Sequence, residues 1–382
     1  MNKSLGELSN PILSLCMIVK NESDNLPRSL ASVKPYVDEM IIVDTGSQDG
    51  TPEIALEYGA KVSYFEWCDD FAAARNYAIS QASGEWILML DADEELVVHS
   101  QAFLDEITSQ SEVVAYFATY NEFNDQNNVT PAYRISLFRN LLEVKYIGRY
   151  HEYLVMGSPY RIPDNTAYTK SISILHYGFS KDQLLKKNIS RNIPMLERIR
   201  QQEGLNLRLL QTLAAMYRNT QQLDKLQGCY AEALEMLLPN LIEGNKPEDF
   251  LAVPSFMVSL ATEALNQNDY ETARLLCQRG NEWCDNFPPL NYITGVTLRC
   301  LGFPLGSVAY FENCLRLGRE KSYYKGEPFD VSYMTTYPAY DLGCIYMELK
   351  RYSEAVAAFE VTLKFDANFI AAQEKITEIE SL

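Results

Sequence analysis

The first half of the chain alternates apolar runs with amphipathic segments. The apolar runs have the length of buried strands and cover residues 12–19, 40–43, 61–65 and 86–90. Helical patterns separate these runs, beginning at Asn25, Thr51 and Phe71. Because strand and helix alternate over about eighty residues, the pattern predicts a parallel α/β sheet. Three later strand-like runs without long helices between them predict a mixed or antiparallel extension, at 113–120, 133–140 and 144–148.

The second half is helical throughout from about Lys186, with a repeat. Residues 340–366 place small and large side chains as a tetratricopeptide repeat does, with Gly343 at a small position. Ala261 and Gly295 are 34 residues apart, which is the period of that repeat. Insertions around 239–251 and 320–334 displace the other copies. The pattern predicts about four helix pairs stacked as a short solenoid, closed by a terminal helix over 368–382.

Composition and charge narrow the function. A chain of 382 residues suggests two domains, and its net charge of −18 argues against a general nucleic-acid binder. The eight cysteines show no zinc-type pair spacing. The first ten residues contain no signal-peptide core, and no apolar run has the length of a transmembrane helix. We therefore expect a cytoplasmic protein with reduced thiols.

The most informative stretch is EWILMLDADEEL, residues 85–96. Its apolar run ends abruptly at Asp91 and Asp93, where a strand of a parallel sheet would present its carboxyl end. Ligands of such sheets bind beyond the carboxyl ends of the strands. Carboxylates two residues apart can share a divalent metal that also holds substrate phosphates. The alternative is a solvated acidic loop.

Several segments together resemble the family-2 glycosyltransferases, which have a GT-A fold. They are ILSLCMIVKNESDNL, IIVDTGSQDGT, WCDDFAAARNYAISQASGEWILMLDADEEL, RYHEYL and LHYGFS, in the family's order from about Ile12 to about Asn192. The subgroup that the chain resembles carries tetratricopeptide helices after the catalytic domain and includes the glycocin-type peptide S-glycosyltransferases. The resemblance implies a GT-A catalytic domain, a Rossmann-like mixed sheet, over residues 1–192 and a helical solenoid over 193–382.

The resemblance also assigns the nucleotide-sugar site. Asp93 of the DXD motif would ligate Mg²⁺ or Mn²⁺ bridging the donor diphosphate, and Asp91 would lie near the ribose or the same metal. Such an ion neutralises charge on the leaving nucleoside diphosphate. Asp44 and Glu22 would lie around the base and ribose, where carboxylates accept hydrogen bonds, although each could instead cap a turn or a helix. Thr45 stands where many relatives have a second aspartate.

Three further residues complete the implied site. Arg75 would point to the nucleotide, with an ion pair to Asp69 or Asp70 as the alternative. Glu152 lies in the place of the acidic residue that deprotonates the acceptor as it attacks the anomeric carbon. His176 matches a histidine that often completes the metal shell.

Two other features of the sequence lie just before Arg75. The pair Asp69-Asp70 is expected to cap the helix that begins at Phe71. Trp67 either lines the sugar pocket or packs in the core, and we favour the core.

The expected function is metal-dependent, inverting transfer of a sugar, hexosyltransferase-type, from a UDP-linked donor to a peptide or protein. A saccharide or lipid-linked acceptor in surface polysaccharide assembly is the alternative acceptor. Two alternatives come from other classes, a non-catalytic tetratricopeptide scaffold and a nucleotidyltransferase. The repeats would bind the acceptor, brace the catalytic domain or form a homodimer interface.

Overall fold

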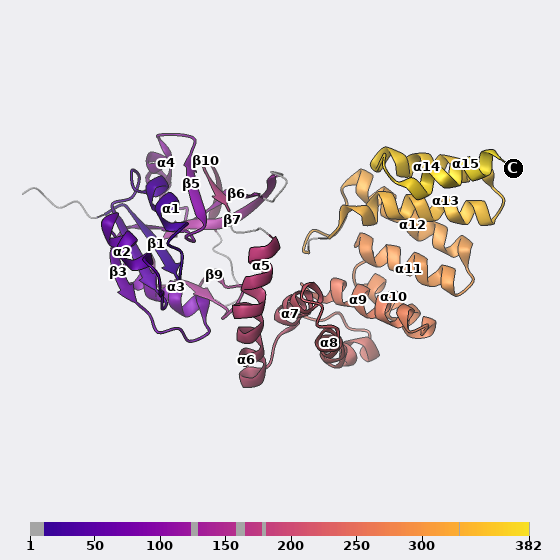
Figure 1. The fold of residues 1–382 in the computed structure, drawn as a ribbon, viewed down its shortest axis with the longest axis horizontal. Helices are drawn as coiled ribbons and strands as arrows, with labels where there is room; N and C mark the ends of the chain where they lie inside the picture. The colour runs from indigo at the N-terminus through magenta and orange to yellow at the C-terminus, as the bar shows by residue number, and fades with distance from the viewer. Residues whose placement is uncertain (1–10, 124–128, 158–164, 178–180, 328, 382) are drawn as a thin grey trace, which may run out of the picture. The chain divides into compact units, whose positions relative to one another are not determined.

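The computed structural model describes residues 11–123, 129–157, 165–177, 181–327 and 329–381. The chain divides into two compact units, the first ending at Glu203 and the second beginning at Gly204. The first unit contains the sheet, and the second is built from helices (Figure 1). Within the described ranges, no helix has the length and hydropathy needed to cross a membrane.

A mixed sheet of eight strands forms the first unit. Its parallel half has the order β3-β2-β1-β4, with β1 (Leu13–Val19), β2 (Glu39–Asp44), β3 (Lys61–Tyr64) and β4 (Trp86–Met89). The other strands are β5 (Glu94–Val98), β6 (Ala115–Phe123), β7 (Val129–Arg139) and β10 (Thr166–His176). β7 pairs antiparallel with β4, and the sheet continues through β6 and β10 to β5. Both the parallel half and its mixed extension are as the sequence predicted.

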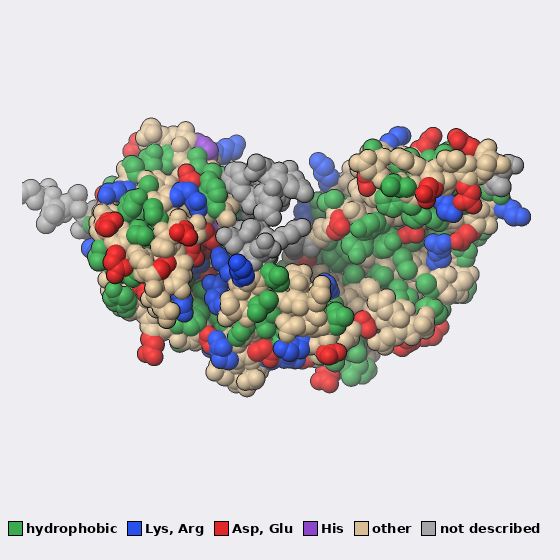
Figure 2. All heavy atoms as spheres, in the orientation of Figure 1, with side chains coloured by type: hydrophobic (Ala, Val, Ile, Leu, Met, Phe, Trp, Pro, Cys, Tyr) green, Lys and Arg blue, Asp and Glu red, His purple; other side chains and the backbone are tan. Residues whose placement is uncertain are grey.

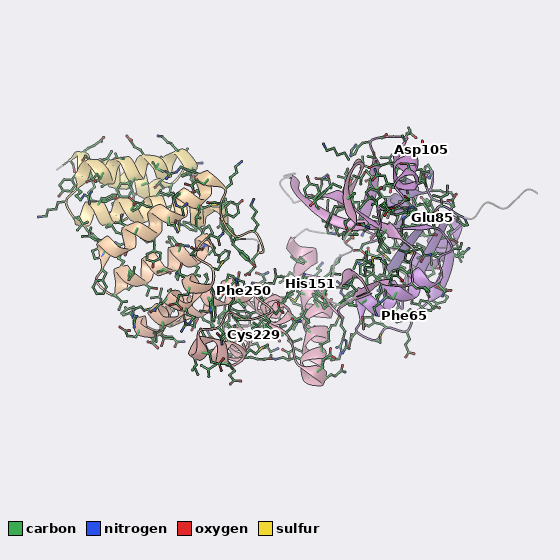
Figure 3. All side chains as sticks on the ribbon, turned by 180° about the vertical axis from the view of Figure 1, so that it is seen from behind. Phe65, Glu85, Asp105, His151, Cys229 and Phe250 are labelled. Atoms are coloured by element: carbon green, nitrogen blue, oxygen red, sulfur yellow. The ribbon has the colours of Figure 1, made fainter. Side chains whose placement is uncertain are left out.

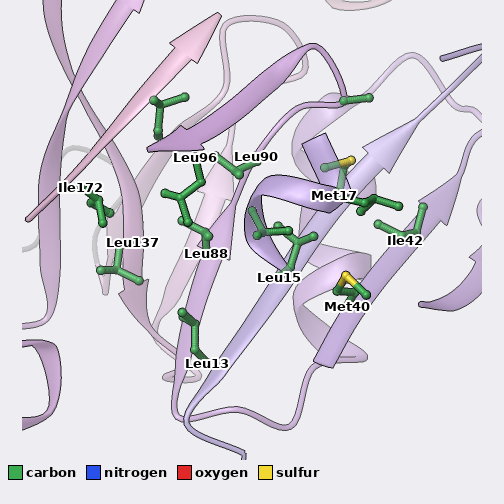
Figure 4. Close-up of a cluster of buried hydrophobic side chains, with 14 of the residues drawn as sticks. Leu13, Leu15, Met17, Met40, Ile42, Leu88, Leu90, Leu96, Leu137 and Ile172 are labelled. Atoms are coloured by element: carbon green, nitrogen blue, oxygen red, sulfur yellow. The ribbon is translucent and has the colours of Figure 1, made fainter. Parts of the chain in front are cut away.

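Helices cover both faces of the parallel half. One face packs against α1 (Leu26–Val33), α2 (Thr51–Glu57) and α4 (Phe103–Ser109). The other face packs against α3 (Phe71–Ser80) and the hairpin of β8 (Val144–Ile147) and β9 (Tyr153–Met156). Along β1, Leu15 and Met17 point to the first face (Figure 4), whereas Cys16 points to the second. A strand buried on both sides needs an unbroken apolar sequence, which explains the runs in this half of the chain.

A helical column ends the first unit (Figure 1). In it, α5 (Lys181–Lys187) continues into a π-helical turn, η1 (Asn188–Asn192), and then into α6 (Ile193–Glu203). The amide of Asn192 donates a hydrogen bond of 2.9 Å to the side-chain oxygen of Asn188, and both side chains are buried. Buried polar groups need such partners, so this pair stabilises the wider turn. The domain boundary expected after residue 192 falls inside this column.

Helix pairs build the second unit, as the periodicity predicted. They are α7 (Leu207–Asn219) with α8 (Leu223–Glu243), α9 (Val253–Asn266) with α10 (Tyr270–Trp283), α11 (Pro288–Cys300) with α12 (Pro304–Glu320), and α13 (Thr336–Glu348) with α14 (Tyr352–Phe365), followed by α15 (Ile370–Glu380). In two pairs a glycine faces an aromatic ring. A Cβ atom at Gly295 would lie 2.6 Å from the ring of Phe311, and one at Gly343 would lie 2.5 Å from Phe359. These helices therefore approach more closely than any larger residue permits.

The predicted insertion between α12 and α13 is a loop followed by a 3-10 turn, η2 (Val331–Met334). The segment Lys321–Glu327 of this loop, which we call the strap, reaches back to earlier helix pairs. The Glu327 side chain is buried and accepts hydrogen bonds from the Gln211 amide of α7 at 2.9 Å and the Ser255 backbone N–H of α9 at 3.3 Å. The strap thus joins helices that are far apart in sequence.

Charged side chains of both signs are interspersed over the face of each unit seen in Figure 2. All eight cysteines are free thiols, and five of them are buried: Cys16, Cys229, Cys277, Cys284 and Cys314. The burial expected for most of these thiols is confirmed.

Candidate functional site

A cleft of about 350 Å³ opens beyond the carboxyl ends of β1, β2 and β4. This is the place where open α/β sheets bind their ligands. Six of the seven predicted site residues line the cleft: Glu22, Arg75, Asp91, Asp93, Glu152 and His176. The seventh, Asp44, is the last residue of β2, and its neighbour Thr45 lines the cleft. The structure therefore brings together residues that span more than 150 positions of sequence.

Arg75 connects two of the acidic residues. Its Nη2 lies 2.9 Å from Asp91 Oδ1, and its Nε lies 2.7 Å from Glu152 Oε1. Burial disfavours the charged guanidinium, but the two carboxylates outweigh this effect and hold the pKa of Arg75 well above its usual value. Burial also acts against the Asp91 carboxylate, and Arg75 nevertheless lowers the pKa of Asp91. The alternative partners Asp69 and Asp70 do not hold Arg75.

The residues before α3 have separate roles. Asp70 caps the helix, because its side chain accepts a hydrogen bond from the Ala73 backbone N–H at 2.8 Å. Asp69 instead accepts hydrogen bonds from Trp67 Nε1 at 2.9 Å and from Arg198 Nη2 at 2.8 Å. The predicted capping is therefore right for Asp70 and wrong for Asp69.

Trp67 lies on the cleft wall. Its side chain is only partly buried and packs edge-on against the ring of Phe71, with ring centroids 4.8 Å apart. We had favoured a core position for this tryptophan, and the structure corrects that expectation. The short segment between β3 and α3 has no strand pairing that would draw the ring into the sheet.

Asp93 lies between a histidine and a lysine. His176 Nε2 is 3.5 Å from Asp93 Oδ1, and Lys187 Nζ is 3.2 Å from Asp93 Oδ2. Burial alone would raise the pKa of Asp93, but His176 and Lys187 together lower it below its usual value. The same pairing raises the pKa of His176 against the opposing effect of burial. Asp93 is therefore held as an ionised carboxylate between His176 and Lys187.

Asp93 and His176 could supply two ligands of a metal site. An ionised carboxylate and an imidazole are ligands that Mn²⁺ accepts, and oxygen ligands suit Mg²⁺. Across the residues that the structure describes, no group of three His, Cys, Asp or Glu side chains could hold an ion by itself. The donor set fits an ion that takes its remaining ligands from substrate phosphates and water.

Glu22 and Asp44 lie at the ends of the first two strands. The Glu22 carboxylate accepts a hydrogen bond from Asn25 at 2.8 Å, and burial, with Asp93 and Asp91 nearby, raises its pKa. Asp44 Oδ1 accepts hydrogen bonds from the backbone N–H groups of Gly46 and Ser47, both at 2.9 Å, so the turn-capping role is real. Its second oxygen, Oδ2, is buried and accepts none from the described residues. Such unsatisfied buried acceptors are uncommon in folded proteins.

Glu152 approaches the cleft from the segment that precedes β9. Its side chain is 13% exposed and is oriented through Oε1 by Arg75. Its neighbours Tyr150 and His151 also line the cleft, and Figure 3 shows His151 beside the α5–α6 column. Burial raises the pKa of Tyr150 to about 12, so that this neighbour stays protonated at neutral pH.

One structural pair of the site could not be foreseen. The buried Glu94 forms a double ion pair with Arg134 of β7, with both contacts at 2.6 Å. Glu94 Oε2 also accepts a hydrogen bond of 2.9 Å from the Asp91 backbone N–H. This arrangement fixes the turn that carries Asp91 and Asp93. The acidic run after Asp93 was visible in the sequence, but its partner lies 40 residues away on another strand.

Two basic residues of the helical column were also missed. Lys187 and Arg191 line the cleft beside Asp93 and Tyr150. Both lie where the strand pattern ends and a helical pattern begins, and nothing local distinguishes them from surface lysines and arginines. The only signal was their position inside the segment that resembles the family, which reaches about Asn192.

Residues 14–175 match the family model described as glycosyl transferase family 2. A TPR repeat-containing protein of Synechococcus elongatus is 43% identical over 188 residues, which cover 47% of this chain and 46% of that protein. The SPbeta prophage-derived glycosyltransferase SunS of Bacillus subtilis is 28% identical over 269 residues, which cover 68% of this chain and 60% of SunS. The chain thus spans about half to three-fifths of the length of these relatives.

Glucosyl-3-phosphoglycerate synthase of Mycobacterium tuberculosis is among the solved structures that align with the chain. The alignment covers 49% of this chain and 80% of the synthase, with 16% identity and a TM-score of 0.33. The family match begins at the second residue of β1 and stops one residue before the end of β10, so it includes the cleft-bordering ends of β1, β2 and β4 but not His176. The sheet unit of this chain therefore carries a domain that matches glycosyl transferase family 2.

Proposed function

We propose that the chain is a metal-dependent, inverting glycosyltransferase that moves a sugar from a UDP-linked donor to a peptide or protein side chain. The observation that supports this most is the meeting of Asp91, Asp93, Glu152 and His176 in one cleft, with Arg75 linking two of them. In the proposal, one cleft thus contains the acceptor base, the pair of metal ligands and the nucleotide pocket.

In the proposed donor site, Asp93 and His176 would hold a divalent ion, and such an ion would supply positive charge for the departing diphosphate. Arg75 orients Asp91 through an ion pair. Because 35% of the Asp91 side chain is accessible, it can also bind the ribose. Glu22 lines the cleft and is proposed to accept hydrogen bonds from the base or ribose, with Asp44 at the end of β2 as a second acceptor.

In the proposed acceptor step, Glu152 takes the proton from the acceptor group as that group attacks the anomeric carbon. Arg75 binds Oε1, which orients the carboxylate and leaves Oε2 without a hydrogen bond from the described residues. The bond to the diphosphate oxygen breaks as the new glycosidic bond forms, and the sugar inverts. The transition state resembles the oxocarbenium ion of glycoside hydrolysis.

A peptide or protein acceptor is favoured by the similarity to SunS and by the helix pairs of the second unit. Stacked helix pairs offer extended surfaces that suit peptides. A saccharide or lipid-linked acceptor is the alternative for the same cleft. Product analysis with peptide and with saccharide acceptors would separate the two.

The first test is thermal stabilisation of the full chain by nucleotides, with and without Mn²⁺. A ligand that binds only the native state at about a hundred times its Kd stabilises it by about 2.7 kcal/mol. We expect a metal-dependent rise of melting temperature with UDP that Asp93→Ala abolishes. Asp105→Ala, at an exposed position on α4, is the matched control and should keep the rise.

Two outcomes would redirect the proposal. No stabilisation by any nucleotide would contradict an enzyme and favour a tetratricopeptide scaffold. Turnover of a nucleoside triphosphate with a sugar phosphate, without turnover of a nucleotide sugar, would indicate a nucleotidyltransferase.

A further inference from the structure

The charges that line the cleft are not all accounted for by the proposed site. Four carboxylates face it, Glu22, Asp91, Asp93 and Glu152. Arg75 is already shared between Asp91 and Glu152. A bound nucleoside diphosphate would add further negative charge to the four carboxylates of the cleft. Its phosphates therefore need cationic side chains in addition to a single metal ion.

Further cations of the cleft come from the helical column. Lys187 is the last residue of α5, and Arg191 lies within the π-helical turn η1. The buried Asn188–Asn192 hydrogen bond stabilises this wider turn, which sets both basic side chains along the cleft wall. A π-turn is less stable than an α-turn and often occurs where function needs it. Here its result is a pair of cations four positions apart.

Lys187 is placed to change partners. Its Nζ lies 3.2 Å from Asp93 Oδ2, while 37% of its side chain is exposed. A divalent ion on Asp93 would repel the ammonium group from the same carboxylate, since like charges at this distance repel strongly. The flexible stem of lysine allows its ammonium group to move to the nearest new anion. That anion would be the diphosphate held by the ion.

Arg191 is already oriented towards the cleft. Its guanidinium lies 5.4 Å from the ring centroid of Phe71, and its Nε donates a hydrogen bond to Asn192 Oδ1 at 2.9 Å. Both contacts leave Nη1 and Nη2 available, and a guanidinium can bind phosphate oxygens through two N–H groups.

We propose that Lys187 and Arg191 together bind the diphosphate of the donor, with Lys187 exchanging Asp93 for a phosphate oxygen when the metal ion binds. The proposal rests on the proposed donor site and identifies two binding residues that it lacked. It assigns to the π-helical turn the role of presenting them.

The test compares ligands with and without phosphates on the full chain. UDP is titrated by calorimetry in the presence of Mn²⁺, and uridine is titrated by ligand-observed NMR. Lys187→Gln and Arg191→Gln should each weaken UDP binding by roughly tenfold or more, because each loses a charge-assisted contact. Uridine binding should change less than twofold. Lys186→Gln, an exposed neighbour on α5, is the control and should bind UDP as the unaltered chain does.

A second readout uses Mn²⁺ alone. Because Lys187 competes with the ion for Asp93, Lys187→Gln should bind Mn²⁺ more tightly in the absence of nucleotide, whereas Arg191→Gln should not. Unchanged UDP affinity in Lys187→Gln, or an equal loss of uridine affinity, would overturn this inference while leaving the donor site standing. Failure of the unaltered chain to bind UDP would overturn both proposals.

Discussion

At the scale of single residues, the acidic residues of the candidate site differ in their ion-pair partners. Glu152 and Asp91 share Arg75, whereas Asp93 is paired with His176 and Lys187. The pair Glu152 and Asp91 therefore has a different environment from Asp93, which allows different tasks in one cleft. The assignment of Glu152 to proton transfer can be tested apart from the donor site.

Glu152→Gln keeps the shape of the side chain and removes its basicity. We expect the turnover of donor and acceptor to fall by about 10²- to 10⁴-fold, the usual contribution of a general base. The affinity for UDP with Mn²⁺ should stay within about twofold, because Glu152 is not assigned to the donor. Steady-state kinetics and calorimetry on the same preparation check both. Equal losses of turnover and UDP affinity would contradict the role.

Glu39 supports the fold through a pH-dependent contact. Burial opposes its charge, but hydrogen bonds from Lys61, Ser14 and Ser83 lower the pKa of Glu39 to about 2, and its side chain is 7% exposed. Because the folded pKa lies below the unfolded one, the stabilisation is present above about pH 4.5 and is lost as the pH falls towards 2.

Glu39→Gln should therefore lower the free energy of unfolding by about 2 kcal/mol at pH 7, after allowance for the exposed Lys61. The difference from the unaltered chain should shrink as the pH falls from 5 to 3. Urea denaturation at several pH values measures it. Lys61→Met, which removes only the exposed partner, should cost less, and a pH-independent loss would show that Glu39 acts through packing alone.

At the scale of elements, the hydrophobic pattern predicted the strands and the helix pairs correctly. It did not predict the irregular turn within the helical column. The parallel strands and the helix pairs follow from apolar runs and from the 34-residue period, because burial selects those side chains. The turn carrying Asp91 and Asp93 followed from the same pattern. The π-helical turn η1 did not, because the bond between Asn188 and Asn192 depends on burial that a local pattern does not reveal.

The helix pairs can be tested at their closest approach. In Gly343→Ala the new Cβ would lie 2.5 Å from the ring of Phe359, so the pair must separate. We expect the helical unit to lose about 1–3 kcal/mol, the usual result of overpacking. Scanning calorimetry of the full chain should show a lower transition for that unit.

Gly228→Ala is the matched control, because a Cβ there meets nothing within 4 Å and the residue lies inside α8. It should stabilise by about 0.5–1 kcal/mol through helix propensity. If Gly228→Ala lowered the stability of the helical unit as much as Gly343→Ala, the loss in Gly343→Ala could not be assigned to the contact with Phe359.

At the scale of the whole chain, the sequence predicted two kinds of architecture in the right order. It predicted Glu152 and His176 in the cleft but not all of the distant partners that complete it. Lys187 meets Asp93 across 94 residues, and Arg134 meets Glu94 across 40. Such contacts depend on strand order and on where a helix lies, and a single sequence carries no direct record of either.

The strap gives a prediction at this scale. Glu327→Ala removes the acceptor that Gln211 and the Ser255 backbone N–H share, and leaves both donors buried in part. We expect a loss of about 1–3 kcal/mol in the helical unit. Hydrogen exchange should report it in α7 and α9, which lie far from residue 327 in sequence. Faster exchange confined to α12 and α13 would contradict a link between distant pairs.

A stack of repeats ordinarily behaves as a row of neighbours, in which each repeat feels only the next one and the ends unravel first. The strap breaks that rule, because one carboxylate from the loop after the third pair fastens the first and second pairs. The stability of each of these three pairs therefore depends on the other two. Unfolding one of these pairs alone would break hydrogen bonds of Glu327 that stabilise the others, so the three pairs should unfold in one transition. Limited proteolysis should therefore cleave the helical unit only when the three pairs unfold together.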